Sequence, residues 1–218
     1  MEECDQGYGY ILYRTTVTGP GWNDRLFINE LRDRAHIFVD GEYLETIQRD
    51  RGRFVGQTEK TFDVKPEGTQ LDILVENQGR ANFAPFMQEY RGITENVFLN
   101  DSFVLSNWEH YPLKMDNLEN LAWEANDDSI QEKSPAFFKA NLKLDGEPCD
   151  TYIYPKDWHK GFITVNGFNI GRYWNIGPQY SLYIPAPLLK KSDNEIIIFE
   201  EEKPGKEIHF SEKLITDF

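Results

Sequence analysis

Two tandem β-sandwiches in an all-β chain are what this 218-residue sequence predicts, from three observations. Short runs rich in Val, Ile, Phe and Tyr are separated by Gly, Asn, Asp and Pro, which is typical of strands joined by turns. Helical periodicity is scarce. The order of strands and turns in the first half of the chain recurs in the second half. Together these observations favour sheet packed on sheet, once in each half.

The individual elements follow from the same pattern. Two segments outside the strands have other expected structures: Asp116–Ala125 should form one short helix or a loop, and Pro187–Lys191 a single helical turn. The clearest strand signals lie at Tyr8–Thr18, His36–Val39, Thr61–Val64, Leu71–Glu76, Gly161–Val165, Ser181–Ile184 and Glu195–Glu200.

The repeat is centred on two dipeptides that favour tight hairpin turns. Asp40-Gly41 follows the first strand of the repeat, and Asn166-Gly167 follows its counterpart. Type I′ turns need positive φ at both central residues, which Asp-Gly and Asn-Gly tolerate best. We therefore expect the two turns to be equivalent, with Thr61–Val64 and Ser181–Ile184 as the return strands of the two copies. The boundary between the copies should fall near Arg91–Asp101, which gives domains 1–98 and 99–218.

Charge and composition exclude several classes of protein. The net charge of −14 argues against a nucleic-acid partner, because phosphate binding needs clustered Lys and Arg. No run approaches the ~20 apolar residues of a membrane span. Cys4 and Cys149 fit no metal spacing and are interpreted as two separate thiols. The cellular compartment stays open.

The most specific segment runs from Asp157 to Phe199. It contains Val165-Asn166-Gly167, then Gly171-Arg172-Tyr173-Trp174, then Gly177-Pro178-Gln179. This order resembles the C-terminal signature of the β-galactosidases of glycoside hydrolase family thirty-five. The chain also starts with a Met-Glu-x-x-x-Gln-x-Tyr-Gly pattern that resembles an internal segment of that family. Met1 is accordingly expected to be an internal methionine of a longer protein.

The resemblance carries expectations about fold and function. It implies that both domains are jelly-roll β-sandwiches of the galactose-binding-like type. It also implies a parent enzyme that removes terminal β-linked galactose with retention, using two glutamates of a catalytic barrel outside this chain. The expected partners are that barrel, galactosides and a second copy of the parent in a homodimer. A free-standing galactose-binding module is the alternative.

Catalytic, metal and cofactor sites have no candidates in the sequence. A retaining glycosidase needs two carboxyl groups ~5–5.5 Å apart. With 37 Asp and Glu residues in the chain, two of them will lie close together somewhere, so proximity alone does not indicate a catalytic pair. Glu200-Glu201-Glu202 is interpreted as the exposed end of a strand. The four histidines lack metal-ligand spacing. They are His36, His110, His159 and His209. No cofactor is expected, and this chain alone is expected to be inactive.

Sugar binding by aromatic rings is the remaining possibility. An exposed Trp or Tyr can stack on the apolar face of galactose, whereas packing in a core or an interface is the alternative. From the candidates we single out Trp108, Tyr111 and Trp174 as sugar-binding residues. We also expect Trp174 to be a core ring whose loss costs several kcal/mol. The full set of candidates is Trp22, Trp108, Tyr111, Trp123, Tyr173 and Trp174.

Two further expectations concern surfaces and turns. Glu76 should pair with Arg80 across a turn at Gly79. A face of the chain that packs on an absent barrel should show an apolar or aromatic patch. The segments Gly171–Gln179 and Trp108–Tyr111 are the expected contributors.

Overall fold

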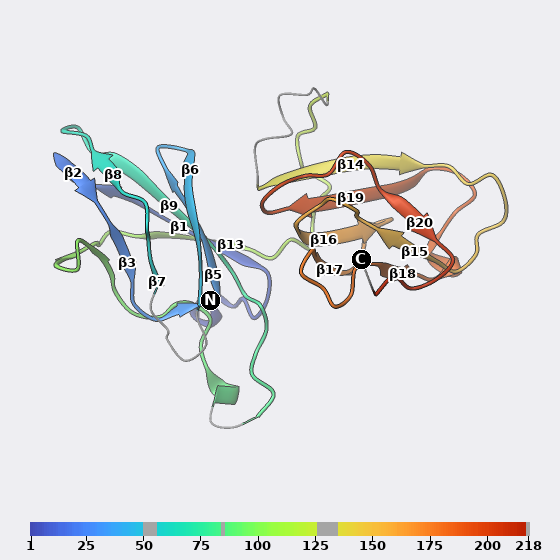
Figure 1. Cartoon of the computed structure of the whole chain (residues 1–218), viewed down its shortest axis with the longest axis horizontal. Helices are drawn as coiled ribbons and strands as arrows, with labels where there is room; N and C mark the ends of the chain where they lie inside the picture. Colours follow the sequence, from blue (N-terminus) through green and yellow to red (C-terminus); the bar gives the residue numbers. More distant parts are fainter. Residues whose placement is uncertain (50–55, 84–85, 126–134, 217–218) are drawn as a thin grey trace. The chain divides into compact units, whose positions relative to one another are not determined.

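The computed structural model describes residues 1–49, 56–83, 86–125 and 135–216, and the chain divides into two compact units, Met1–Asn117 and Leu118–Phe218 (Figure 1). Both units are built from strands. The first contains two 3-10 helices, η1 (Glu2–Cys4) and η2 (Phe86–Gln88), and the second contains η4 (Ala186–Leu188). No described helix is long and apolar enough to cross a membrane.

The strands of the first unit are β1 (Tyr10–Val17), β2 (Gly21–Asp24), β3 (Leu26–Ile28), β4 (Leu31–Arg32), β5 (Arg34–Val39), β6 (Glu42–Gln48), β7 (Gly56–Gln57), β8 (Phe62–Val64), β9 (Thr69–Glu76), β10 (Gly92–Ile93), β11 (Val97–Leu99), β12 (Phe103–Val104) and β13 (Glu109–Leu113). Those of the second are β14 (Ala136–Leu142), β15 (Thr151–Tyr154), β16 (Lys160–Val165), β17 (Phe168–Trp174), β18 (Leu182–Ile184), β19 (Asn194–Glu200) and β20 (His209–Ser211).

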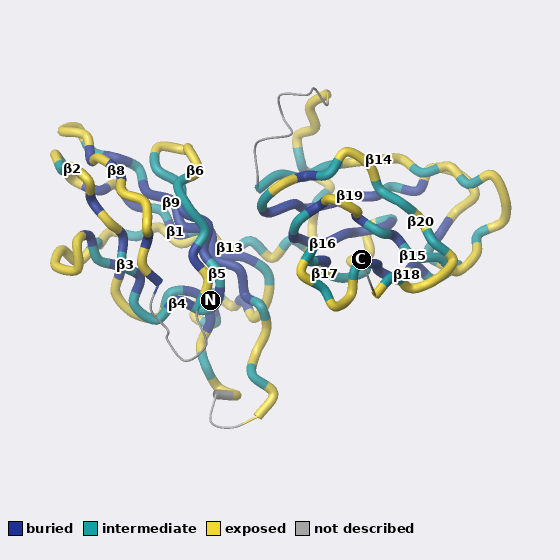
Figure 2. The backbone as a smooth tube through the Cα atoms, viewed as in Figure 1, coloured by how far each residue is buried: buried dark blue, intermediate teal, exposed yellow. Residues whose placement is uncertain are grey.

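The first unit is a sandwich of a five-stranded sheet, in the order β13-β1-β9-β5-β6, and a four-stranded sheet, β12-β11-β3-β7. Two further two-stranded sheets, β2-β8 and β10-β4, belong to the same unit. Alternate residues of both sheets meet in one core, and the buried positions concentrate in β1, β9 and β5 (Figure 2). Each fully buried Ile or Leu there contributes roughly 1.5–3 kcal/mol of transfer free energy.

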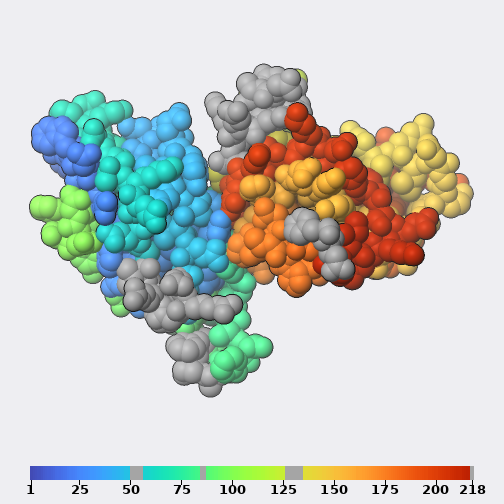
Figure 3. Space-filling view, in the orientation of Figure 1, coloured from blue at the N-terminus to red at the C-terminus, as the bar shows by residue number. Residues whose placement is uncertain are grey.

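The second unit repeats the plan with fewer strands. A four-stranded sheet, β14-β19-β16-β17, packs on a three-stranded sheet, β18-β15-β20, around Ile153, Ile163 and Ile198. All six residues of β16 are buried, as expected for a central strand. The early strand β14 pairs with the late strand β19, so yellow and red segments adjoin on the surface (Figure 3).

The two hairpin turns have the same conformation. The φ values are 49° and 82° at Asp40 and Gly41, and 50° and 79° at Asn166 and Gly167. In each hairpin the strand after the turn carries a β-bulge, at Leu44 in β6 and at Ile170 in β17. The Asp40 carboxylate accepts the backbone N–H of Gln70 at 2.9 Å, and the Asn166 side-chain oxygen accepts that of Glu195 at 3.0 Å. The predicted hairpins are therefore present and equivalent.

The hairpin partners differ from the strands that the repeat suggested. β6 and β17 are the strands that return from the two turns. The expected return strands, β8 and β18, pair instead with β2 and β15. Asp116–Ala125 contains neither helix nor strand, and η4 supplies the single turn expected near Pro187.

The first unit extends to Asn117, beyond the boundary at 98/99 that the sequence suggested. The reason is that β11 pairs with β3 and β13 pairs with β1 along Tyr10–Arg14, so residues 97–113 complete the first sandwich.

Candidate functional site

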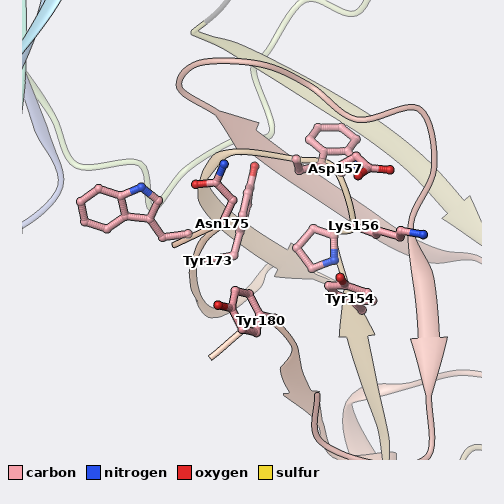
Figure 4. A pocket seen from close by; sticks show the side chains of 9 residues that line it. Tyr154, Lys156, Asp157, Tyr173, Asn175 and Tyr180 are labelled. Atoms are coloured by element: carbon pink, nitrogen blue, oxygen red, sulfur yellow. The ribbon is translucent and has the colours of Figure 1, made fainter. Parts of the chain in front are cut away.

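A shallow pocket in the second unit is where one of the sugar-binding candidates lies. Trp174 ends β17 and lines this pocket with Asn175 and Tyr180, opposite Tyr154 at the end of β15 (Figure 4). The cavity between these residues has a volume of about 20 Å³, room for about one water molecule and far below the ~300–1,000 Å³ of most ligand pockets. It is therefore a surface depression that a ligand can touch but cannot enter.

Trp174 is only half-buried, and its neighbour Tyr173 is the core ring. Tyr173 is 3% exposed and belongs to the core, whereas the Trp174 indole rests on the Lys160 ammonium, which lies 4.9 Å from the ring centroid. The bulge between β16 and β17 sets which residues face inward, and no local sequence signal reveals it. The expectation that Trp174 is a core ring is wrong, and the large stability cost belongs to Tyr173.

Beneath the pocket lies a carboxylate that the sequence suggested would be exposed. Glu200 is fully buried and Glu201 is 2% exposed, so that interpretation of Glu200-Glu201-Glu202 is wrong for the first two residues. The Glu200 carboxylate accepts five hydrogen bonds, from the backbone N–H groups of His159 (2.9 Å), Lys160 (3.1 Å), Glu202 (2.8 Å) and Lys203 (3.1 Å) and from the Tyr173 hydroxyl (2.9 Å).

The electrostatics of these two glutamates are those of structural groups. Burial raises the pKa of Glu200 to about 7, and the surrounding donors oppose that rise. Burial and the neighbouring Glu200 also raise the pKa of the Tyr173 hydroxyl. Glu201 forms a buried ion pair with Lys160 at 3.0 Å. Because every oxygen of Glu200 is committed to a loop N–H or a hydroxyl, this carboxylate has no room for an attacking or proton-donating role on a substrate.

The other two sugar-binding candidates lie in the first unit. Trp108 is half-buried against the core of that unit, and its indole N–H donates to the Leu105 carbonyl at 3.2 Å. Tyr111, on β13, is 42% exposed and donates to Glu109 at 2.5 Å, with the Arg14 guanidinium 6.0 Å from its ring centroid. Trp108 thus packs structurally, while Tyr111 offers an exposed ring.

The remaining aromatic candidates are exposed to different degrees. Trp22 is 72% exposed on β2, and Trp123 is 38% exposed with the Lys139 ammonium 5.4 Å from its ring centroid. Among the described residues, no group of three His, Cys, Asp or Glu side chains could hold a metal ion. Cys4 and Cys149 are both free thiols.

A cluster of arginines and carboxylates in the first unit is the strongest charged feature that the sequence did not reveal. The Glu89 carboxylate forms ion pairs with the guanidinium groups of Arg32 (2.7 Å) and Arg49 (3.2 Å). The Arg91 guanidinium pairs with the Asp33 carboxylate at 2.6 Å. Arg32 also pairs with Glu30, so three arginines face three carboxylates and the cluster offers no net charge to a ligand. It fastens the segment after β9 to β4 and to the residue that follows β6.

The turn after β9 differs from the expected Glu76–Arg80 pair. Arg80 instead donates to the Glu2 carboxylate and to the Glu89 carbonyl, and Gly79 adopts φ 106°. Glu2 also accepts the backbone N–H of Arg91 at 2.9 Å. Arg80 therefore ties this loop to the N-terminal segment, a contact between residues 78 positions apart that no local pattern could reveal.

The arginine cluster predicts an acid-labile first unit. Burial alone would raise the pKa of Glu89, but hydrogen bonds from Arg32 and Arg49 outweigh it and hold this pKa below the usual 4.5. A carboxyl whose pKa is lowered by folding stabilises the protein above pH 4.5, and this contribution is lost as pH falls through the folded pKa. Glu89→Gln should therefore cost about 1–3 kcal/mol at neutral pH.

Urea unfolding of wild type and Glu89→Gln across acid pH measures this effect. The difference in the free energy of unfolding should be full near neutrality. It should shrink as pH falls below about 4.5, where Glu89 of the unfolded chain is protonated, and disappear below the lowered pKa of the folded state. A difference that is independent of pH would contradict the assignment.

Several residues around the pocket were not among the sequence candidates. Tyr154, Asn175 and Tyr180 line it, and Tyr152, Tyr183 and His209 lie on the adjoining sheet. The alternation Thr151-Tyr152-Ile153-Tyr154 was the available signal, since Ile153 is fully buried and its tyrosine neighbours face the other way.

Comparison with known proteins agrees with the two units. Residues 1–114 match the family model "Beta-galactosidase, first all-beta domain", and residues 135–194 match "Beta-galactosidase, galactose-binding domain". "Beta-galactosidase 1" of Dictyostelium discoideum is 38% identical over 96% of this chain and 34% of the relative. "Beta-galactosidase-1-like protein 2" of Homo sapiens is 36% identical over 95% of this chain and 31% of the relative.

"Beta-galactosidase" of Xanthomonas manihotis is 38% identical over 84% of this chain and 29% of the relative. The chain thus spans about a third of the length of the curated relatives it matches. The first matched domain alone covers more than half of the chain. The chain belongs to the beta-galactosidase family, of which it carries the first all-beta domain and the galactose-binding domain.

Proposed function

We propose that this chain is the non-catalytic part of a β-galactosidase and that its two sandwiches brace a catalytic barrel supplied by the rest of the family protein. The observation that carries the proposal is the pair of matches to the first all-beta and galactose-binding domains, within relatives about three times as long as the chain. In the parent, that barrel would remove terminal β-linked galactose. A homodimer of the parent would form through surfaces other than those that contact the barrel.

The buried charges support a bracing role. Glu200, Glu201 and the cluster around Glu89 are committed to backbone N–H groups, Lys160 and arginines. They rigidify loops and strand ends and leave no pair of carboxyl groups poised for displacement at a sugar carbon. Rigid, well-buried sandwiches suit the task of holding a neighbouring domain in place.

Two assays test the proposal. The chain alone should not hydrolyse a chromogenic β-galactoside above buffer background, because it lacks two placed carboxylates. Next, this chain should replace the matching third of "Beta-galactosidase 1" of Dictyostelium discoideum in a chimera that stays folded and active. Turnover by the isolated chain would overturn the proposal, as would a folded chimera without activity.

A further inference from the structure

The second unit carries an aromatic strip on the outer face of its three-stranded sheet. On β15, Tyr152 lies opposite Tyr183 of β18, and Tyr154 lies opposite His209 of β20. Between them Ile153 points into the core, where it is fully buried. Because side chains alternate along a strand, both tyrosines of β15 face away from that core.

The rings of the strip contact one another across the strands. The centroids of Tyr152 and Tyr183 are 5.5 Å apart, and those of Tyr154 and His209 are 6.3 Å apart. Tyr183 is 45% exposed, and the side chain of His209 is 41% exposed. Tyr152 and Tyr154 are about 6.6 Å apart along the strand, so the strip is longer than a single pyranose ring.

Tyr154 joins the strip to the pocket. The pocket is lined by Tyr154, Trp174, Asn175 and Tyr180, which come from the ends of β15 and β17 and from the loop that follows β17 (Figure 4). The backbone N–H of Asn175 donates to the His159 carbonyl at 2.8 Å and fixes this loop. The aromatic strip on the sheet and the residues that line the pocket thus form one continuous surface.

Hydrogen-bonding groups along this surface are open to a ligand. Within the described residues, the hydroxyls of Tyr152 and Tyr154 and the side-chain amide of Asn175 make no hydrogen bond to protein. Ring faces beside open hydroxyls and amides match the two faces of a sugar, an apolar C–H face and a rim of hydroxyl groups.

The charges near the strip decide between neutral and anionic glycans. Asp150 accepts the backbone N–H of Ala186 at 2.8 Å and also the Tyr183 hydroxyl, which lowers its pKa. Glu207 lies 3.2 Å from the His209 imidazole. These carboxylates lie beside the aromatic rings and can accept sugar hydroxyls, whereas sulfate or uronate groups would meet like charge.

We propose that the strip formed by Tyr152, Tyr154, Tyr183 and His209, together with the pocket at Asn175, binds an uncharged oligosaccharide. The chain of sugars lies along β15 with one ring stacked at the Tyr152–Tyr183 pair and another resting on Tyr154 at the mouth of the pocket. This binding site adds a second role to the bracing role, because it uses the outward face of one sheet in the second unit to hold a sugar chain.

Titration with β-1,4-galactotetraose, observed by NMR of the whole chain, tests the site. The tetraose should bind weakly, with a Kd of about 1 mM or below. Galactose alone should bind about tenfold less tightly, because a single sugar contacts only one aromatic ring of the strip. Tyr154→Ala and Tyr183→Ala should each weaken tetraose binding about tenfold. Tyr43→Ala, which removes a 53% exposed strand tyrosine of the first unit, should leave it unchanged.

Two further measurements keep the outcome clear. Tyr183→Phe retains the ring and should bind within a few-fold of wild type, so it separates loss of stacking from loss of folding. A galacturonate tetramer of equal length should not compete. No binding of the neutral tetraose, binding unchanged in both alanine variants, or equal binding of the anionic tetramer would each overturn the proposal. The tyrosine variants should support an active chimera, so failure of this site and failure of the bracing role are distinguishable.

Discussion

Gly161→Ala should unfold the second unit. A Cβ at this position would lie 1.7 Å from the Phe199 carbonyl oxygen and 2.8 Å from its carbonyl carbon. Both atoms belong to the backbone of β19, so no side-chain rotation relieves the overlap. The Tyr173 hydroxyl, 3.1 Å from the same Cβ, blocks movement toward β17. Because β16 is the central strand between β19 and β17, the three strands cannot separate locally.

The expected loss exceeds about 4 kcal/mol, at the upper end of what single substitutions cause. For a domain of this size that corresponds to a fall in melting temperature of tens of degrees, at roughly 4–8 °C per kcal/mol. Calorimetry should show the transition of the second unit lost or strongly lowered. Gly146→Ala is the matched control in the same unit, since nothing lies within 4 Å of its Cβ. Equal melting temperatures for the two variants would contradict the close approach.

Local chemistry explains what the sequence could predict about the fold. The turns at Asp40-Gly41 and Asn166-Gly167 were predictable because their backbone conformation depends on the two turn residues themselves. The strands that precede the turns, β5 and β16, were predictable for the same reason, since alternation and β-branched residues act within a few positions. The strand signals did not identify the return strands β6 and β17. The type of each of these elements therefore follows from neighbouring residues alone.

Contacts between distant residues explain what the sequence could not predict. The first unit continues to Asn117 because β13 pairs with β1, about one hundred residues away in the sequence. The boundary expected near Arg91–Asp101 was drawn from a local segment, which carries no information on this extra edge strand. The first unit therefore continues past the 98/99 boundary.

The candidate site shows the same division. Trp174 was expected to be a core ring, but the bulge between β16 and β17 turns it toward the pocket and turns Tyr173 inward. Three consecutive glutamates normally indicate solvent exposure, because buried charges are rare. Glu200 is an exception because backbone N–H groups of a distant segment, at His159 and Lys160, donate to its carboxylate together with the neighbouring N–H groups of Glu202 and Lys203. Such compensation is visible only in the folded chain.

The same carboxylate yields the second large effect, because Glu200→Gln should remove more stability than any exposed charge in the second unit. An amide has one acceptor oxygen where the carboxylate has two. If the amide NH₂ replaces Oε1, it faces the backbone N–H groups of Lys160, Glu202 and Lys203. If the amide NH₂ replaces Oε2, it faces the backbone N–H of His159 and the Tyr173 hydroxyl. Either orientation leaves buried donors unsatisfied.

Each unsatisfied buried donor costs about 1–3 kcal/mol, so a total loss of about 3–5 kcal/mol is expected from chemical denaturation of the second unit above the Glu200 pKa of about 7, where the side chain is a carboxylate. Glu195→Gln on the same strand is the matched control. Its carboxylate pairs at the surface with Lys139 and is 38% exposed, so its loss should cost no more than about 1 kcal/mol. Equal stabilities of the two variants would mean that the loop around His159 holds its position without Glu200. In contrast, a large loss confined to Glu200→Gln would identify this buried carboxylate as the group that joins β19 to the loop beneath the pocket.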